Sequence, residues 1–78
     1  MARGMIRGMV RYKNRVPVRG AIIILERMVN VFNEQLKEED WEGVYLGYTQ
    51  TNMHGEFCFS VPDNTVTYRV KVFDNRHE

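Results

Sequence analysis

The chain has 78 residues, of which 44% are hydrophobic and 27% are charged, and its formal net charge is +1. These values are typical of one small folded domain, and so short a chain is a poor host for a large enclosed active site. The near-neutral balance argues against nucleic-acid or membrane binding driven by overall charge, and the single cysteine, Cys58, excludes an internal disulfide framework.

The basic N-terminal segment lacks the apolar stretch of a signal peptide, and no apolar run approaches the roughly 20 residues of a membrane span. We therefore expect a soluble, cytoplasmic chain with no membrane partner and no cofactor. Apolar side chains recur at every second position from Ile6 onward, which predicts a half-buried strand. The inward face of this strand is Ile6, Gly8, Val10 and Tyr12, and the outward, basic face is Arg7, Met9, Arg11 and Lys13.

The next strand is expected to begin near Ala21 and is apolar on both faces. Ala21, Ile23 and Leu25 share one face, and Ile22 and Ile24 share the other. This pattern predicts burial on both sides, either within the fold or against a partner.

From about Asn30 the alternation weakens, and residues 33–40 combine a capping asparagine with acids and good helix formers. Either a short helix or an acidic loop fits this segment. Because its charges cannot be buried without partners, we expect residues 33–42 to be an insertion outside the core. Beside it, Trp41 suits two roles: it covers one end of the core, or it anchors a partner or a sugar.

Three further strands are expected at residues 44–51, 56–61 and 66–73. A tight turn at Asn52 to Gly55, with Gly55 at positive φ, and a second turn at residues 62–65 separate them. We predict that these strands form a meander in which Arg69 and Lys71 point outward. The predicted core of the domain is Ile6, Val10, Ile23, Leu25, Leu46, Phe57, Phe59, Tyr68 and Val70.

Four motifs occur in order along the chain. They are Gly8-x-Val10, Pro17-Val18-x-Gly20-Ala21-x-Ile23-x-Leu25, Thr51-x-x-x-Gly55-x-Phe57-x-Phe59, and Tyr68-x-Val70-x-Val72. Together they resemble the carboxypeptidase regulatory-like domain of the transthyretin (prealbumin) type. The resemblance implies one all-β domain over residues 1–78, with its core at about 5–73. It would be a small Greek-key β-sandwich of about five strands with a short acidic helix or loop inserted, and a non-catalytic structural module.

Catalytic and metal chemistry find little support in the sequence. His54, His77 and Cys58 lack the paired spacing of zinc ligands, and Cys58 and His54 are poorly placed to act as nucleophile and base. In B-type repeats of bacterial collagen-binding surface proteins, which are a related class, a lysine and an asparagine form an isopeptide bond beside a buried acid. Lys13, Asn75 and Glu26 are the residues that would take these roles here, but Lys13 falls on the outward basic face.

Two functions from different classes follow. The first is a structural or protein-interaction module that binds a protein partner, or forms a homo-oligomer, through a sheet edge. Its candidate surface is Ile22, Ile24, Arg7, Arg11, Lys13, Arg69, Lys71 and Trp41. The alternative is a small β-barrel that binds RNA or DNA through the basic N-terminal strand face, with Arg69 and Lys71 contributing.

Overall fold

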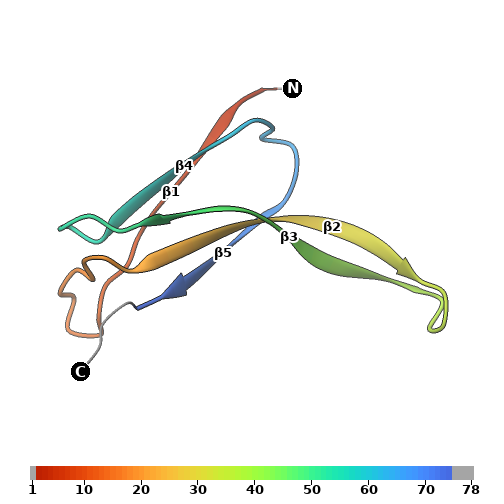
Figure 1. Cartoon of the computed structure of the whole chain (residues 1–78), viewed down its shortest axis with the longest axis horizontal. Helices are drawn as coiled ribbons and strands as arrows, with labels where there is room; N and C mark the ends of the chain where they lie inside the picture. Colours follow the sequence, from red (N-terminus) through yellow and green to blue (C-terminus); the bar gives the residue numbers. More distant parts are fainter. Residues whose placement is uncertain (1, 75–78) are drawn as a thin grey trace.

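The protein is all-β in the computed structural model, which describes residues 2–74. The strands are β1 (Gly4–Met9), β2 (Ile22–Asn33), β3 (Glu38–Gln50), β4 (Glu56–Val61) and β5 (Tyr68–Phe73). Figure 1 shows that they form two layers, with a long β2–β3 hairpin projecting to one side.

One layer pairs β1 with β4, and the other has the order β3-β2-β5, with all pairings antiparallel. The β1–β2, β3–β4 and β4–β5 connections all pass from one sheet to the other, as expected for a Greek-key sandwich. The predicted meander of the last three strands is wrong, because β4 pairs with β1 and β5 pairs with β2. Turn residues mark where the chain reverses, but they do not determine which sheet the next strand joins.

The core lies between the sheets and is centred on β2. Ile23 is fully buried, and its alternate neighbours Ala21 and Leu25 are buried beside it, as their shared face predicted. Val18 and Val61 are the other buried apolar side chains among residues 2–74. The predicted core residues Ile6, Val10, Phe57, Phe59 and Tyr68 are half-buried, since they lie on or next to β1, β4 and β5, which are all edge strands.

The alternation predicted for β1 is confirmed. Ile6 and Gly8 are half-buried, whereas Arg7 and Met9 are exposed. Gly8 pairs directly with Phe57, and a Cβ at Gly8 would collide with the Phe57 ring. The glycine therefore leaves the space in which this aromatic side chain lies across β1.

The turn at Asn52 to Gly55 is confirmed in detail. Gly55 has φ +74° and donates its N–H to the Asn52 carbonyl at 2.9 Å. The Asn52 side-chain oxygen accepts the N–H groups of His54 and Glu56, as asparagine commonly does in such turns. In the second turn, Asp63 accepts both the N–H and the hydroxyl of Thr65.

A buried hydroxyl joins the β3–β4 corner to the start of β2. Thr51 Oγ1 donates to the Val18 carbonyl at 2.6 Å and accepts the Ala21 N–H at 2.8 Å. The Thr51 N–H also donates to the Ala21 carbonyl at 2.9 Å. These bonds satisfy backbone groups that would otherwise be buried without partners, so they fix the connection that precedes the most buried strand.

The acidic segment is the tip of the β2–β3 hairpin, and the helical alternative is wrong. β2 continues to Asn33 and β3 starts at Glu38, so that only four residues form the turn. The Asn33 side-chain oxygen accepts the N–H groups of Gln35 and Leu36, and Lys37 has φ +53°. The asparagine thus caps a hairpin turn rather than a helix.

A β-bulge changes the faces of β3. Leu25 pairs with Gly47 but Glu26 pairs with Tyr45, which leaves Leu46 without a partner on β2. The prediction of Leu46 in the core is therefore wrong, and its side chain is 48% exposed. Val70 was also predicted in the core but is 37% exposed, because β5 is an edge strand of its sheet.

Candidate interaction surfaces

The outer face of the three-stranded sheet carries a shallow apolar groove. Its volume is about 450 Å³, and its lining residues are Ile22, Ile24, Tyr45, Tyr48 and Gln50. The bulge beside Leu46 brings both tyrosines onto this face, since without the extra residue they would point to opposite sides. Ile22 and Ile24 are only half-buried here, so the described residues leave the second face of β2 partly open.

Next to the groove, a carboxylate is enclosed by two cations. Glu26 Oε1 accepts Arg69 Nε at 2.8 Å and lies 3.5 Å from Lys71 Nζ. The Glu26 side chain is only 11% exposed. The Arg69 hydrogen bond, helped by the charges of Arg69 and Lys71, lowers the pKa of Glu26 below its usual 4.5 against the opposing effect of desolvation.

This carboxylate predicts a specific pH dependence. Because the pKa of Glu26 is lower in the folded chain, its charged form stabilises the fold above pH 4.5, and this contribution is lost as the pH falls through the lowered value. Glu26→Gln should therefore be less stable than the native chain at neutral pH, with the difference shrinking in acid. Urea unfolding midpoints measured over a pH series check this. A difference that is the same in acid and at neutral pH would contradict it.

The predicted basic residues do not form one surface. Arg7 and Arg11 are exposed on the outer side of the β1–β4 sheet, and Lys13 lies in the following turn. Arg69 and Lys71 instead lie on the outer side of the other sheet, beside Glu26. The two groups thus occupy opposite outer sides of the sandwich.

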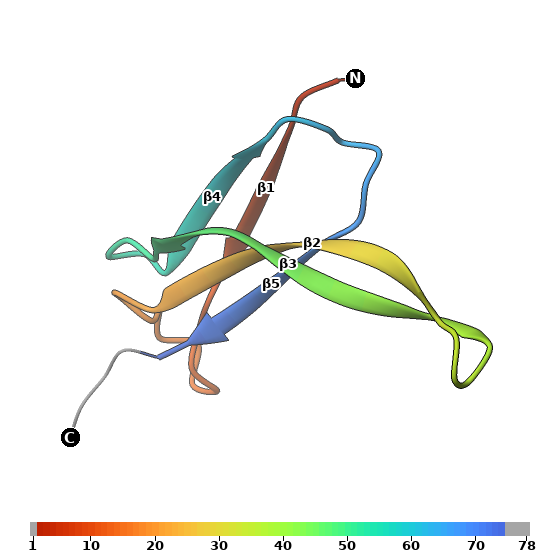
Figure 2. The ribbon, with the colours of Figure 1, turned by 45° about the vertical axis from the view of Figure 1, so that its right-hand side comes forward.

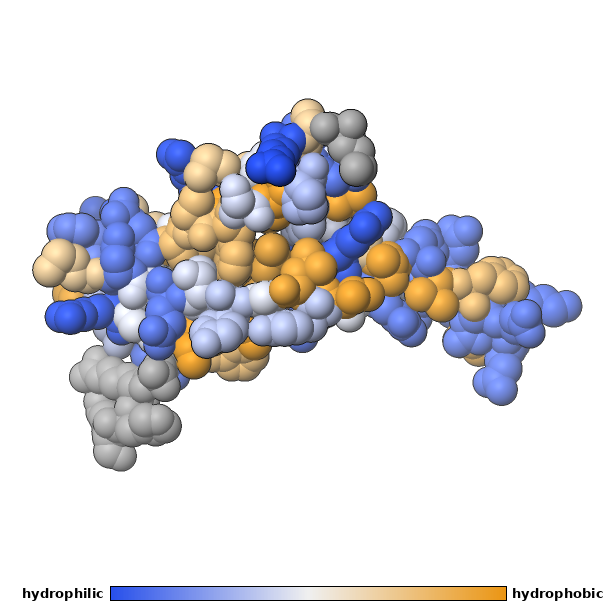
Figure 3. Space-filling model, turned by 45° about the horizontal axis from the view of Figure 1, so that its top comes forward, coloured by the Kyte–Doolittle hydropathy of each residue, from blue (hydrophilic) through white to orange (hydrophobic). Residues whose placement is uncertain are grey.

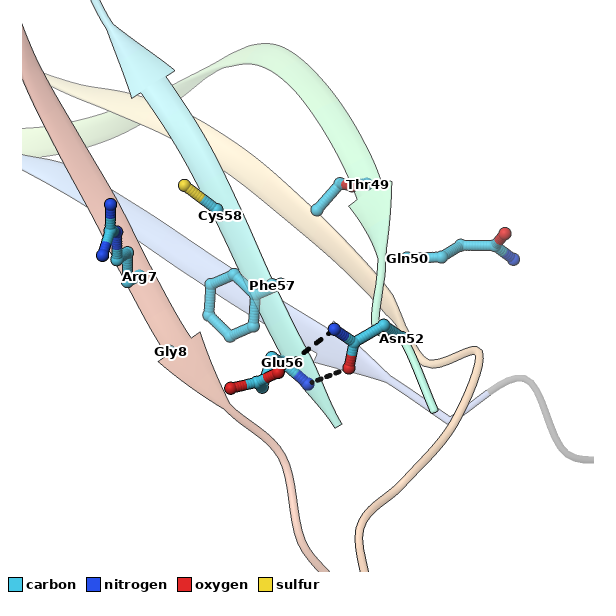
Figure 4. Close-up of a pocket in the computed structure, with 8 residues that line it drawn as sticks. All are labelled: Arg7, Gly8, Thr49, Gln50, Asn52, Glu56, Phe57 and Cys58. Atoms are coloured by element: carbon cyan, nitrogen blue, oxygen red, sulfur yellow. Dashed lines mark hydrogen bonds between the residues drawn. The ribbon is translucent and has the colours of Figure 1, made fainter. Parts of the chain in front are cut away.

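A polar cleft opens where β3 and β4 diverge into different sheets. Its volume is about 510 Å³, and it is lined by Arg7, Gly8, Thr49, Gln50, Asn52, Glu56, Phe57 and Cys58 (Figure 4). Cys58 is exposed at this cleft. Among residues 2–74, no three His, Cys, Asp or Glu side chains gather in a way that could hold a metal ion. His77 lies outside the described residues.

Lys13 and Glu26, which were named for an isopeptide bond, form no ion pair with each other among residues 2–74. Glu26 is engaged by Arg69 and Lys71, Lys13 is exposed, and Asn75 lies outside the described residues. Trp41 does not cover an end of the core: it lies on the projecting hairpin, opposite Asn30, and is 57% exposed. The prediction that Trp41 covers an end of the core is therefore wrong, and its alternative role, as an anchor for a partner or a sugar, stays a prediction.

The projecting hairpin is the surface that the sequence did not reveal. Beyond Arg27, β2 has no β5 partner, and residues 29–42 form a two-stranded ribbon that we call the arm. Phe32 and Leu36 are exposed on it together with Trp41. Figure 3 shows apolar side chains continuing from the body along the arm toward a hydrophilic tip. The alternation of Val29 and Val31 was a signal for an extended β2, but the acidic residues that follow obscured it.

Comparison of the chain with protein-family models, curated proteins and solved structures found no significant match. Within residues 2–74 there is no helix with the length and apolar character needed to cross a membrane.

Proposed function

We propose that this chain is a non-catalytic protein-interaction module that binds another polypeptide through the arm. The observation that carries the proposal is the exposure of Phe32, Leu36 and Trp41 on a ribbon that no third strand covers in residues 2–74. A two-stranded hairpin is marginally stable in water unless a further strand or another element packs on it. Buried aromatic side chains also supply much of the binding energy at protein interfaces. Both considerations favour a protein partner on the arm.

We also propose that the chain is a module of the family that its four motifs resemble. A small two-sheet sandwich and a Gly55 turn leading into the phenylalanine strand β4 fit a transthyretin-like module of the carboxypeptidase regulatory type. The proposed role for such a module is attachment or assembly, with the polypeptide chain as its ligand.

Nucleic-acid binding is the weaker candidate, for a geometric reason. A phosphate-binding face needs several free cations side by side. Here Arg69 and Lys71 form ion pairs with Glu26 on the outer side of the three-stranded sheet. Arg7 and Arg11 lie on the opposite outer side of the sandwich. The basic set that suggested this function is therefore divided.

The test is affinity capture from a cell extract, with the native chain as one bait and Phe32→Ser with Trp41→Ser as the other. We expect that the native bait retains a protein that the arm variant does not retain. Binding of this protein to the native bait should persist after nuclease treatment and at high salt. The matched control is Val16→Ser with Met53→Ser, which changes two exposed apolar side chains outside the arm. Capture that depends on nucleic acid, or equal capture by all three baits, would overturn the proposal.

A further inference from the structure

The arm and β1 carry complementary surfaces within one chain. Residues 34–42 contain five acidic residues and one lysine, whereas residues 1–25 contain six basic residues and no acidic one. Figures 1 and 2 show the arm projecting away from β1 in both views. The arm of one molecule is therefore poorly placed to reach its own β1, but the β1 of another molecule is accessible to it.

One face of the arm combines acids with valines. Val29 pairs with Glu42, and Val31 pairs with Asp40. Because residues two apart on a strand share a face, Glu38 lies on this same side. This arm face is therefore a valine row beside an acidic row.

The outward face of β1 alternates apolar and basic side chains. Met5, Arg7 and Met9 follow one another at every second position in β1, Arg11 continues the series two residues beyond its end, and the two methionines are about half exposed. The β4 neighbours opposite Met5 and Arg7 are the uncharged Ser60 and Cys58. The one carboxylate in this register is Glu56, opposite Met9.

We propose that the arm face of one copy docks on the β1 face of a second copy. The inference goes beyond the proposed function, because it uses the face of the arm opposite Phe32 and Trp41 and names a second copy as the partner of that face. Arg7 and Arg11 are four residues apart, as are Glu38 and Glu42, so each pair spans about 13 Å on an extended strand. With the charged rows aligned, Met9 lies midway between the two arginines, at the level of the Val31–Asp40 pair, and can cover Val31, which adds apolar burial to the ion pairs.

The size of the exposed surface supports such a contact. The chain has 6335 Å² of accessible surface, whereas a compact chain of this mass has about 5,000 Å². The excess is comparable to the roughly 1,200 Å² that a small stable interface buries in total. Docking of the arm also gives the two-stranded ribbon a packing partner that no strand of the described residues supplies.

A charge-swap experiment tests the proposal. Sedimentation velocity over a concentration series should show that the native chain self-associates, and that added salt weakens the association. Arg7→Glu with Arg11→Glu, and separately Glu38→Lys with Glu42→Lys, should each raise the dissociation constant at least about tenfold by placing like charges together. Mixing these two variants should restore association, because each arm then meets a β1 face of opposite charge.

Two controls keep the result interpretable. Arg15→Glu with Arg19→Glu makes the same change in net charge on exposed residues outside the β1 face, and it should leave association intact. Far-UV circular dichroism verifies that every variant folds. If the variant with Arg7→Glu and Arg11→Glu does not fold, the variant with Arg7→Gln and Arg11→Gln takes its place. A native chain that is monomeric at high micromolar concentration, or a mixture that fails to associate, would overturn the inference. Arm-dependent capture of a different protein would then leave the proposed function standing.

Discussion

Gly55→Ala should destabilise the domain by about 3 kcal/mol or more, as positive φ alone costs an L-residue about 1–2 kcal/mol and steric conflict adds to it. Gly55 has φ +74°, and a Cβ there would collide with the Val10 carbonyl oxygen. That oxygen accepts the Val18 N–H at 2.9 Å, and the Val10 N–H donates to the Gly55 carbonyl at 2.8 Å. The collision cannot be relieved without disturbing these bonds. Urea unfolding followed by circular dichroism measures the loss.

Gly20→Ala is the matched control for this substitution. Gly20 has φ +75°, but a Cβ there would have no heavy atom within 4 Å. Gly20→Ala should therefore lower the free energy of unfolding only by the cost of a positive φ, about 1–2 kcal/mol. Equal losses at the two glycines would show that the approach of Gly55 to Val10 does not constrain the fold.

Ile23→Ala should cost about 3 kcal/mol, within the usual range of 2–5 kcal/mol for removing a buried isoleucine side chain. Ile23 has 0% exposure and lies on β2 between the two sheets. The adjacent Ile24 faces outward and is half-buried, so Ile24→Ala should cost about 1 kcal/mol by the area it exposes. Chemical unfolding in dilute solution compares the two variants. Losses of the same size would contradict the assignment of Ile23 to the inner face and Ile24 to the outer face.

Much of the fold could be predicted from local patterns. The alternation in β1 and β4 predicted two half-buried strands, and Asn52 and Gly55 predicted the turn that the structure contains. Such features depend on side-chain direction and on backbone conformation within a few residues. They could therefore be read without knowledge of the rest of the molecule.

Strand pairing could not be predicted in the same way. β4 pairs with β1 across about fifty residues of sequence, and no local signal separates this from a meander. Leu46 illustrates a second limit. One unpaired residue in a bulge moves every side chain beyond it to the opposite face, and periodicity alone does not show where that residue lies.

The candidate surface was predicted only in part. Ile22 and Ile24 form a second apolar face that is visible in the sequence and is only half-buried in the fold, whereas Trp41 is exposed on the arm and does not cover an end of the core. Tyr45 and Tyr48 joined the groove through the bulge, and Phe32 became exposed because β2 extends past its β5 neighbour. These effects arise from the relative lengths of paired strands, which composition does not encode.

The location of Trp41 gives the protein a built-in optical reporter. It is the only tryptophan in the sequence, and it lies on the arm, apart from the sandwich core. Its emission therefore reports on the surroundings of the arm more than on the packing around Ile23. A shift of that emission to shorter wavelength on binding, with no change in backbone circular dichroism, would signal docking of the arm without an attached label.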